Sequence, residues 1–181
     1  MKSNNIIVRK ALPQDAPDWA VMLLKLDEEV VYTTFQPGER SSDISKYKDK
    51  IISAINYPKS AIFLAFDTLS EDNNVVGYLS VEAYRNNRKS HVATIGIGIL
   101  ESYSSQGIAN QLFIEMIDHA KRNNLRRIEG HVAQSNYKSI ALTQKFGFIT
   151  EGIKRNAIKI NDAYEDEHLM VLEIEVLHHG Q

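Results

Sequence analysis

The sequence predicts a mixed α/β protein, in which helices and strands pack in layers around a central sheet. Segments with apolar residues at helical spacing interrupt segments rich in β-branched and aromatic residues, in the order β-α-α-β-β-β-α-β-α-β-β. The chain has 181 residues, a length that one domain can bury around a core. It shows no internal repeat and no linker rich in Pro, Gly or Ser, so we expect a single domain over residues 1–181.

Composition excludes several classes of function. The chain carries 21 Lys and Arg against 23 Asp and Glu, a net charge of -2, so we expect neither a nucleic acid nor a membrane as partner. It has no cysteine, which excludes disulfides, thiolate metal sites and a thiol nucleophile. We expect no metal site, and none at His178 and His179. Since no signal peptide and no run of roughly 18 apolar residues is found, we expect a cytoplasmic protein.

The first part of the chain predicts one strand and two helices. Residues 6–10 form the strand, and residues 13–15 start a helix with Asp15 in its acidic first turn. The apolar stripe of this helix consists of Trp19, Met22, Leu23, Leu26 and Val30. A turn over residues 34–38 separates it from a second helix that begins after Asp43.

Three strands follow, over residues 61–66, 75–81 and 91–100. The first two are expected to form an antiparallel hairpin around a turn at residues 71–74. The third contains Gly96 and Gly98, and glycines inside a strand indicate either a bulge or a place where something approaches the backbone closely. The remaining elements are a helix over 106–123, a strand over 127–133, a helix over 137–146, and two antiparallel strands over 148–159 and 167–176 joined around residues 161–162.

The segment between the third of these strands and the long helix predicts an anion site. A strand, a glycine-containing turn and a helix N-terminus bring unpaired N–H groups and the positive end of the helix dipole to one spot. Gly107 leaves the backbone bare for a phosphate, and the small Ala109 keeps the approach open. An ordinary strand-to-helix turn, with small residues for packing, gives the same local pattern. Gly96 and Gly98 lie inside a strand rather than in the turn, so a dinucleotide-binding fold is excluded.

Four motifs in order resemble the GNAT N-acetyltransferase family over nearly the whole chain. Residues 104–109 are similar to its acyl-CoA signature at Gly107 and Ala109, and differ at Ser104, where the family has Gln or Arg after a bulged strand. Residues 136–148 resemble the second signature, an Asn, a short helix and then Lys-hydrophobic-Gly-Phe. The start of the chain and its closing hairpin are also similar. The resemblance implies the GNAT fold, a mixed sheet of six to seven strands with helices on both faces.

The resemblance also implies acetyl-CoA as co-substrate and a role for each residue of these motifs. The pyrophosphate would lie on the segment formed by Ser104, Ser105, Gln106, Gly107, Ile108, Ala109 and Asn110. Ile97, Gly98 and Ile99 would pair with the pantetheine arm like an added strand, and a backbone N–H there would face the thioester oxygen. Asn136 would hydrogen-bond the pantetheine amide, and Ser139, Lys145 and Lys138 are further candidates around the cofactor.

The chemistry needs a neutral amine, so a base or a chain of waters must remove its proton. Candidate bases are Glu82, Glu129 and His131, of which the last two share one face of their strand. Glu28 or Glu29, at the end of the first helix, is a further candidate base, and both are candidates for binding the amine. Many relatives have a Tyr acid where this chain has Thr143, whose hydroxyl could bond the sulfur but not protonate it. The thiolate has a pKa of about 8.5 by analogy with cysteine, low enough to leave unaided or with help from water.

Three functions stay open at this stage. The first is an N-acetyltransferase that moves the acetyl group of acetyl-CoA to a primary amine, of a small molecule or a protein N-terminus, by direct attack in a ternary complex. The second is a noncatalytic acyl-CoA-binding sensor module, which would bind CoA without turnover. The third is an interaction domain that retains only the fold, against which the open turn at Gly107 argues. The family resemblance adds a homodimer as a further expectation.

Overall fold

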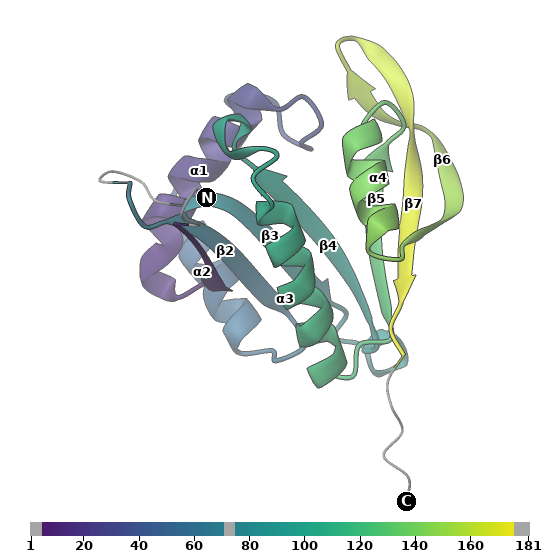
Figure 1. Cartoon of the computed structure of the whole chain (residues 1–181), viewed down its shortest axis with the longest axis horizontal. Coiled ribbons are helices and arrows are strands. Elements are labelled where there is room, and N and C mark those ends of the chain that lie inside the picture. Colours follow the sequence, from purple (N-terminus) through teal and green to yellow (C-terminus); the bar gives the residue numbers. More distant parts are fainter. Residues whose placement is uncertain (1–4, 71–74, 176–181) are drawn as a thin grey trace, which may run out of the picture.

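The computed structural model describes residues 5–70 and 75–175, and Figure 1 shows the chain as a sheet with helices on either side. The predicted turn at residues 71–74 and the pair His178 and His179 lie outside the described residues. The strands are β1 (Ile6–Lys10), β2 (Ala61–Asp67), β3 (Val75–Ala83), β4 (Val92–Ile99), β5 (Arg127–Ala133), β6 (Ile149–Ile160) and β7 (Ala163–Glu173). The helices are α1 (Ala16–Glu29), α2 (Ile44–Ile55), α3 (Ile108–Arg122) and α4 (Tyr137–Lys145). The predicted order of elements is confirmed.

The seven strands form one sheet in the order β1-β2-β3-β4-β5-β7-β6. All neighbours are antiparallel except β4 and β5, which are parallel because α3 carries the chain back across the sheet. Helices α1 and α2 pack on one face and α3 and α4 on the other, so the predicted α/β fold of the GNAT type is confirmed. No helix in the described parts of the chain has both the length and the apolar character needed to cross a bilayer.

Two cores, one on each face, explain the apolar strands in the middle of the sheet. In β2, Phe63 and its alternate neighbours pack against α3, whereas Leu64 and its alternate neighbours pack against α1 and α2. A strand buried on both faces reads as a continuous apolar run rather than an alternating one. Each such side chain stabilises the fold by about 1.5–3 kcal/mol when it is fully buried. These two cores fix the orientation of β3 and β4, which carry the candidate site.

Of the two explanations expected for Gly96 and Gly98, a bulge is wrong and a close approach is confirmed. β4 pairs with β3 in one uninterrupted register, from Ala83↔Ala93 to Gly77↔Ile99. A Cβ at Gly98 would lie 2.3 Å from Cδ2 of Leu26 and 2.9 Å from Cε1 of Tyr78. A side chain at this position would therefore collide with α1 and with β3.

The last strand begins earlier than the sequence predicts, at Ala163 rather than at residue 167. Asn161 and Asp162 both have positive φ, 48° and 64°, which is typical of a two-residue hairpin turn. Such a turn starts pairing immediately, so Ile160 lies opposite Ala163. The polar residues that follow Ala163 hide this strand from an apolar pattern, because the hairpin tip is exposed on both faces.

Candidate active site

The loop between β4 and α3 leaves a run of backbone N–H groups without a partner. After a short 3-10 turn at Glu101–Tyr103, Ser105 (φ 61°) and Gly107 (φ 84°) both take the left-handed conformation. Left-handed residues in alternation with others turn successive N–H groups to one side and create a concave anion site. Within residues 5–70 and 75–175, no acceptor receives the N–H of any residue from 105 to 110. The positive end of the α3 dipole points at the same place.

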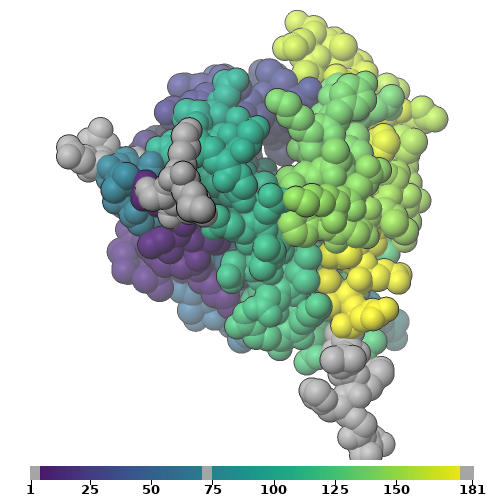
Figure 2. Space-filling model, viewed as in Figure 1, coloured from purple at the N-terminus to yellow at the C-terminus, as the bar shows by residue number. Residues whose placement is uncertain are grey.

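The space above Gly107 is open. A Cβ added to Gly107 would meet no atom within 4 Å. Glycine at this position therefore allows the left-handed backbone conformation and is not required by close packing. Packing alone therefore does not explain this turn. In Figure 2 the surface is hollowed between the teal region that contains the loop and α3 and the green region of α4. The anion site lies at the edge of this hollow.

β4 and β5 diverge after their first residues, which opens the sheet beside the loop. Their ladder ends at Thr94↔Glu129, although β4 continues to Ile99. At the two ends of β4, the Tyr84 N–H donates to the Val92 carbonyl (3.1 Å) and the Leu100 N–H to the Val76 carbonyl (3.0 Å). Since bonding alternates along an antiparallel strand, the backbone groups of Gly98 face β3. Those of Ile97 and Ile99 face the opening, where the ladder with β5 has ended.

Helix α4 borders the opening on the other side. The Asn136 side-chain oxygen accepts the Ser139 N–H (3.2 Å) and so caps α4, while within the described chain its amide nitrogen has no recorded partner. Lys145 Nζ donates to Asn110 Oδ1 (3.0 Å), which joins the end of α4 to the first turn of α3. The structure thus brings residues from both predicted signatures together around one opening. Lys138 is exposed and lies on the outer surface of α4.

The hydroxyl of Thr143 faces its own helix. Thr143 is buried, and its Oγ1 lies 3.0 Å from the Ser139 carbonyl oxygen and 2.9 Å from that of Ile140, so it donates within α4. Bonds of this kind are common for Thr in helices. To donate a hydrogen bond to a ligand atom, this hydroxyl would have to turn its proton away from the helix carbonyls.

Two carboxylates flank Thr94 on the α1/α2 face of the sheet, because Glu82 and Glu129 are its neighbours on β3 and β5. Arg127 donates to Glu129 (2.5 Å) and to Glu151 (2.9 Å), and this hydrogen bonding lowers the pKa of Glu151. The Glu129 carboxylate is therefore neutralised by a guanidinium. Glu82 is exposed; its backbone carbonyl accepts from Thr94 Oγ1 (3.5 Å), whereas its carboxylate makes no hydrogen bond or ion pair with the described residues. His131 lies exposed on the same face, as its parity predicts.

The comparison with known proteins decides the family. Residues 8–169 match the family described as acetyltransferase (GNAT) domain. The chain belongs to the GNAT acetyltransferase family. The chain is 36% identical over 101 residues to the L-amino acid N-acetyltransferase AaaT of Escherichia coli, a segment that spans 55% of this chain and 62% of AaaT.

Solved structures of low sequence identity share its fold. An acetyltransferase of the GNAT family from Streptococcus pneumoniae superposes with a TM-score of 0.85 at 22% identity, over 94% of this chain and 99% of that one. A GNAT superfamily phosphinothricin acetyltransferase from Sinorhizobium meliloti, in complex with AcCoA, superposes with a TM-score of 0.79 at 17% identity, over 94% of this chain and 89% of that one.

The two predicted amine-binding residues at the end of α1, Glu28 and Glu29, differ in their surroundings. The Glu29 carboxylate accepts the backbone N–H of Glu101 (2.9 Å) and lies 3.6 Å from Lys25 Nζ. Glu29 therefore holds the first turn of the loop that precedes the anion site. Glu28 is exposed to solvent beside it.

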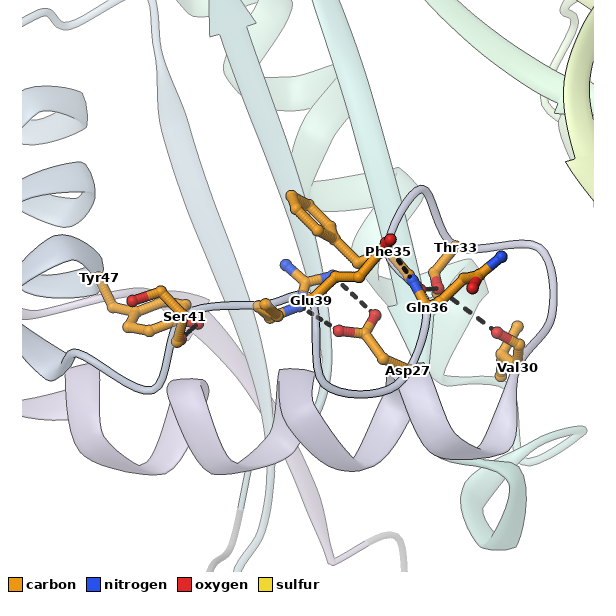
Figure 3. Close-up of polar contacts among 9 residues, drawn as sticks. Asp27, Val30, Thr33, Phe35, Gln36, Glu39, Ser41 and Tyr47 are labelled. Atoms are coloured by element: carbon orange, nitrogen blue, oxygen red, sulfur yellow. Dashed lines mark hydrogen bonds and ion pairs between the residues drawn. The ribbon is translucent and has the colours of Figure 1, made fainter.

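A buried ion pair that the sequence did not reveal holds the segment after α1 in place (Figure 3). Asp27, only 4% exposed, accepts from Arg40 Nε (2.5 Å) and Nη2 (2.8 Å), and the guanidinium lies 4.4 Å from the centre of the Phe35 ring. Burial lowers the pKa of Arg40, but the bonds to Asp27 outweigh it and raise the pKa above its ordinary value. The sequence feature that could have pointed to this pair is the position of Asp27, a carboxylate that directly follows Leu26 of the apolar stripe of α1.

Proposed function

We propose that this GNAT acetyltransferase moves the acetyl group of acetyl-CoA to a primary amine, of a small molecule or a protein N-terminus, by direct attack in a ternary complex. One observation carries the proposal: six consecutive N–H groups, at residues 105–110, have no acceptor among the described residues and lie next to the edge of β4 that β5 leaves open. The N–H groups can bind a pyrophosphate, and the open edge of β4 can form backbone hydrogen bonds with an extended pantetheine arm, as a further strand would. The complex of the Sinorhizobium meliloti relative with AcCoA supports the choice of co-substrate.

The proposed cofactor contacts follow from the geometry of the opening. The N–H groups of residues 105–110 would hold the pyrophosphate, assisted by the hydroxyls of Ser104 and Ser105 and by the charge of Lys145. The backbone groups of Ile97 and Ile99 would pair with the pantetheine arm, and one of their N–H groups would stabilise the thioester oxygen. The free amide nitrogen of Asn136 can still donate to a pantetheine carbonyl while its oxygen caps α4. Bound acetyl-CoA supplies an activated acetyl group.

The acceptor would reach the thioester from the α1/α2 face. An ammonium must lose a proton before it attacks, and Glu82 is the stronger candidate for the base because no guanidinium of the described residues pairs with its carboxylate. Glu129 is the second candidate, held in its ion pair with Arg127. The thiolate can leave without an acid, at a pKa of about 8.5 by analogy with cysteine. In this scheme Thr143 shapes α4 at the opening and does not protonate the sulfur.

The experiment measures binding and turnover separately. Acetyl-CoA is titrated into the purified protein in a calorimeter, and CoA release is followed with a thiol reagent for a panel of amines that begins with L-amino acids, since AaaT is named for them. The protein has no cysteine, so all reactive thiol in this assay comes from CoA. Release that depends on one amine class is the expected result. Binding without release on any amine would favour the sensor module instead, and the absence of binding would contradict both.

A further inference from the structure

The hydroxyl of Tyr78 lies where β4 departs from β5. A Cβ built on Gly96 would lie 3.8 Å from this hydroxyl oxygen, on the α1/α2 face of the sheet. Gly96 follows Thr94, the last β4 residue that pairs with β5, by two positions. The next residue, Ile97, is the first beyond this point whose backbone the proposed function assigns to the acyl arm. In the proposed complex, the phenol would therefore lie beside the thioester, on the side from which the acceptor would come.

The structure fixes the direction of this phenol. Tyr78 lies opposite Gly98, whose missing side chain leaves room for the ring edge and for Leu26. Trp19 packs against the ring with a centroid distance of 6.1 Å. The ring of Tyr78 lies between α1 and the backbone of Gly96 and Gly98, and it extends across β4 towards the opening between β4 and β5. Gly96 and Gly98 thus make the path along which the hydroxyl reaches this position.

The hydroxyl of Tyr78 makes no hydrogen bond with any residue in the described parts of the chain, although the side chain is half-buried close to the Asp27–Arg40 pair. Burial raises the pKa of the Tyr78 hydroxyl, and the negative charges of Asp27 and Glu82 raise it further. The positive charge of Arg40 lowers this pKa, but the net effect is an increase. The phenol is therefore protonated at neutral pH. A protonated phenol can accept a proton from one neighbour while it donates its own to another.

A row of polar side chains leads from Tyr78 to solvent. Tyr78, Ser80 and Glu82 alternate along β3, so they point to the same face. Ser80 Oγ lies 3.3 Å from the same Cβ position at Gly96, and at 3.5 Å it donates to the Gly96 carbonyl. Glu82 ends the row with an exposed carboxylate. The hydroxyls of Tyr78 and Ser80 therefore both lie over Gly96, between the opening and the candidate base Glu82.

We propose that Tyr78 is a catalytic residue that contacts the acceptor nitrogen and passes its proton, by way of Ser80 and water molecules that bridge these side chains, to Glu82. This inference rests on the proposed acetyl transfer. The ammonium loses one proton along the row to the Glu82 carboxylate, which later releases it to water. The freed electron pair on nitrogen forms the N–C bond to the acetyl carbon, and the C–S bond breaks with its electron pair on sulfur. A second N–H proton ends on the CoA thiolate, so the products are an amide, CoA thiol and one proton.

Tyr78→Phe tests the role of the oxygen alone, because the ring and its packing on Trp19 remain. We expect kcat to fall at least tenfold, while KM for acetyl-CoA and Tm stay within error, a split that a merely structural role would not produce. Tyr47→Phe is the matched control. Tyr47 packs against the same Trp19 (5.8 Å), but its hydroxyl donates to the Ser41 carbonyl and lies away from β4. We expect this control to lose some stability and to keep its kcat.

A double-mutant cycle tests the relay. If Tyr78 and Glu82 act on one proton, Tyr78→Phe combined with Glu82→Gln loses no more kcat than the worse single variant. Losses that multiply would overturn the relay, and an unchanged kcat in Tyr78→Phe would overturn the whole assignment. Failure of the proposed function looks different. In that case the wild-type protein releases no CoA with any amine, and this inference fails with it.

Discussion

The Glu29 carboxylate accepts the backbone N–H of Glu101 at 2.9 Å, and so ties the last turn of α1 to the loop before α3. The two residues are far apart in the sequence and belong to different sides of the candidate site. Glu29 ends the helix that leads into the acceptor side, and Glu101 begins the 3-10 turn that precedes the anion site. A single hydrogen bond thus connects the segment expected to bind the acceptor with the segment expected to bind CoA.

Loss of this bond should weaken CoA binding. A hydrogen bond to a charged group contributes about 1 kcal/mol or more, which corresponds to roughly a fivefold change in affinity. We expect Glu29→Ala to raise the calorimetric Kd for CoA by about three- to tenfold. Glu29→Gln keeps an acceptor oxygen and should recover most of the affinity, whereas Glu28→Ala should leave the Kd unchanged. Equal effects of Glu28→Ala and Glu29→Ala would contradict a specific role of this bond.

Gly107→Glu should abolish CoA binding and leave the fold intact. The open space at Gly107 accepts a side chain, but that side chain and its charge would occupy the anion site. The left-handed backbone adds a strain of about 1–2 kcal/mol for any residue other than glycine. Gly107→Ala carries the same strain without the charge, so it should lose much less affinity at a similar Tm. Undiminished CoA affinity in Gly107→Glu would remove the site from this loop.

Gly98→Ala should destabilise the protein, because the added methyl would overlap Leu26 and Tyr78. Overpacking of this kind costs about 1–3 kcal/mol. Gly152→Ala is the matched control in another strand, since a Cβ there meets no atom within 4 Å. Urea unfolding of both variants measures the difference. Equal free energies of unfolding would show that α1 moves aside without cost.

Asp27→Ala should be strongly destabilising, because it leaves the Arg40 guanidinium in the interior without its partner. Removal of one member of a buried pair costs about 3–5 kcal/mol, and the slight exposure of Arg40 reduces this figure. Asp118→Ala removes the partner of Arg122 in an exposed pair on α3 and should cause no measurable loss of stability. If Asp27→Leu combined with Arg40→Met unfolds as readily as Asp27→Ala, the loss would come from packing rather than from the unpaired charge.

His119 should make stability fall on acidification. Its Nε2 donates to the Lys59 carbonyl (3.1 Å), and its Nδ1 accepts from the Asn123 side-chain amide (3.1 Å). Burial is the largest effect and holds the pKa of His119 below its ordinary value of 6.5. The charge of Lys10 lowers this pKa further, and the bond to the Lys59 carbonyl raises it in part. Because the folded pKa is depressed, the stabilisation is complete above 6.5 and is lost as pH falls through the folded value.

Urea unfolding at pH 7.5 and 5.5 checks this prediction. The wild-type protein should lose more free energy of unfolding between these pH values than His119→Gln, which has no titrating group there. The comparison uses only the pH-dependent difference, so a general loss of stability in the variant does not affect it. Equal losses in both proteins would exclude His119 as the cause.

Local patterns in the sequence predicted the elements and their order, because helical and strand periods, caps and turns depend on neighbours in the chain. Gly107 is an example: its left-handed backbone at a helix start follows from the residue type and the helix that comes after it. The start of β7 was missed for the same reason. Its first residues lie at an exposed hairpin tip, where no apolar alternation marks a strand.

The amino-acid sequence alone was enough for the α/β fold, the family resemblance and the loop at Gly107, since each depends on short stretches of chain. Only the tertiary structure decided what surrounds them. It showed that Glu29 holds the Glu101 backbone, that Thr143 bonds within its own helix, and that Tyr78 extends over two glycines of β4. These relationships depend on which strands become neighbours and on where β4 leaves β5. Contacts between distant segments are set by packing of the whole sheet, and no local pattern contains them.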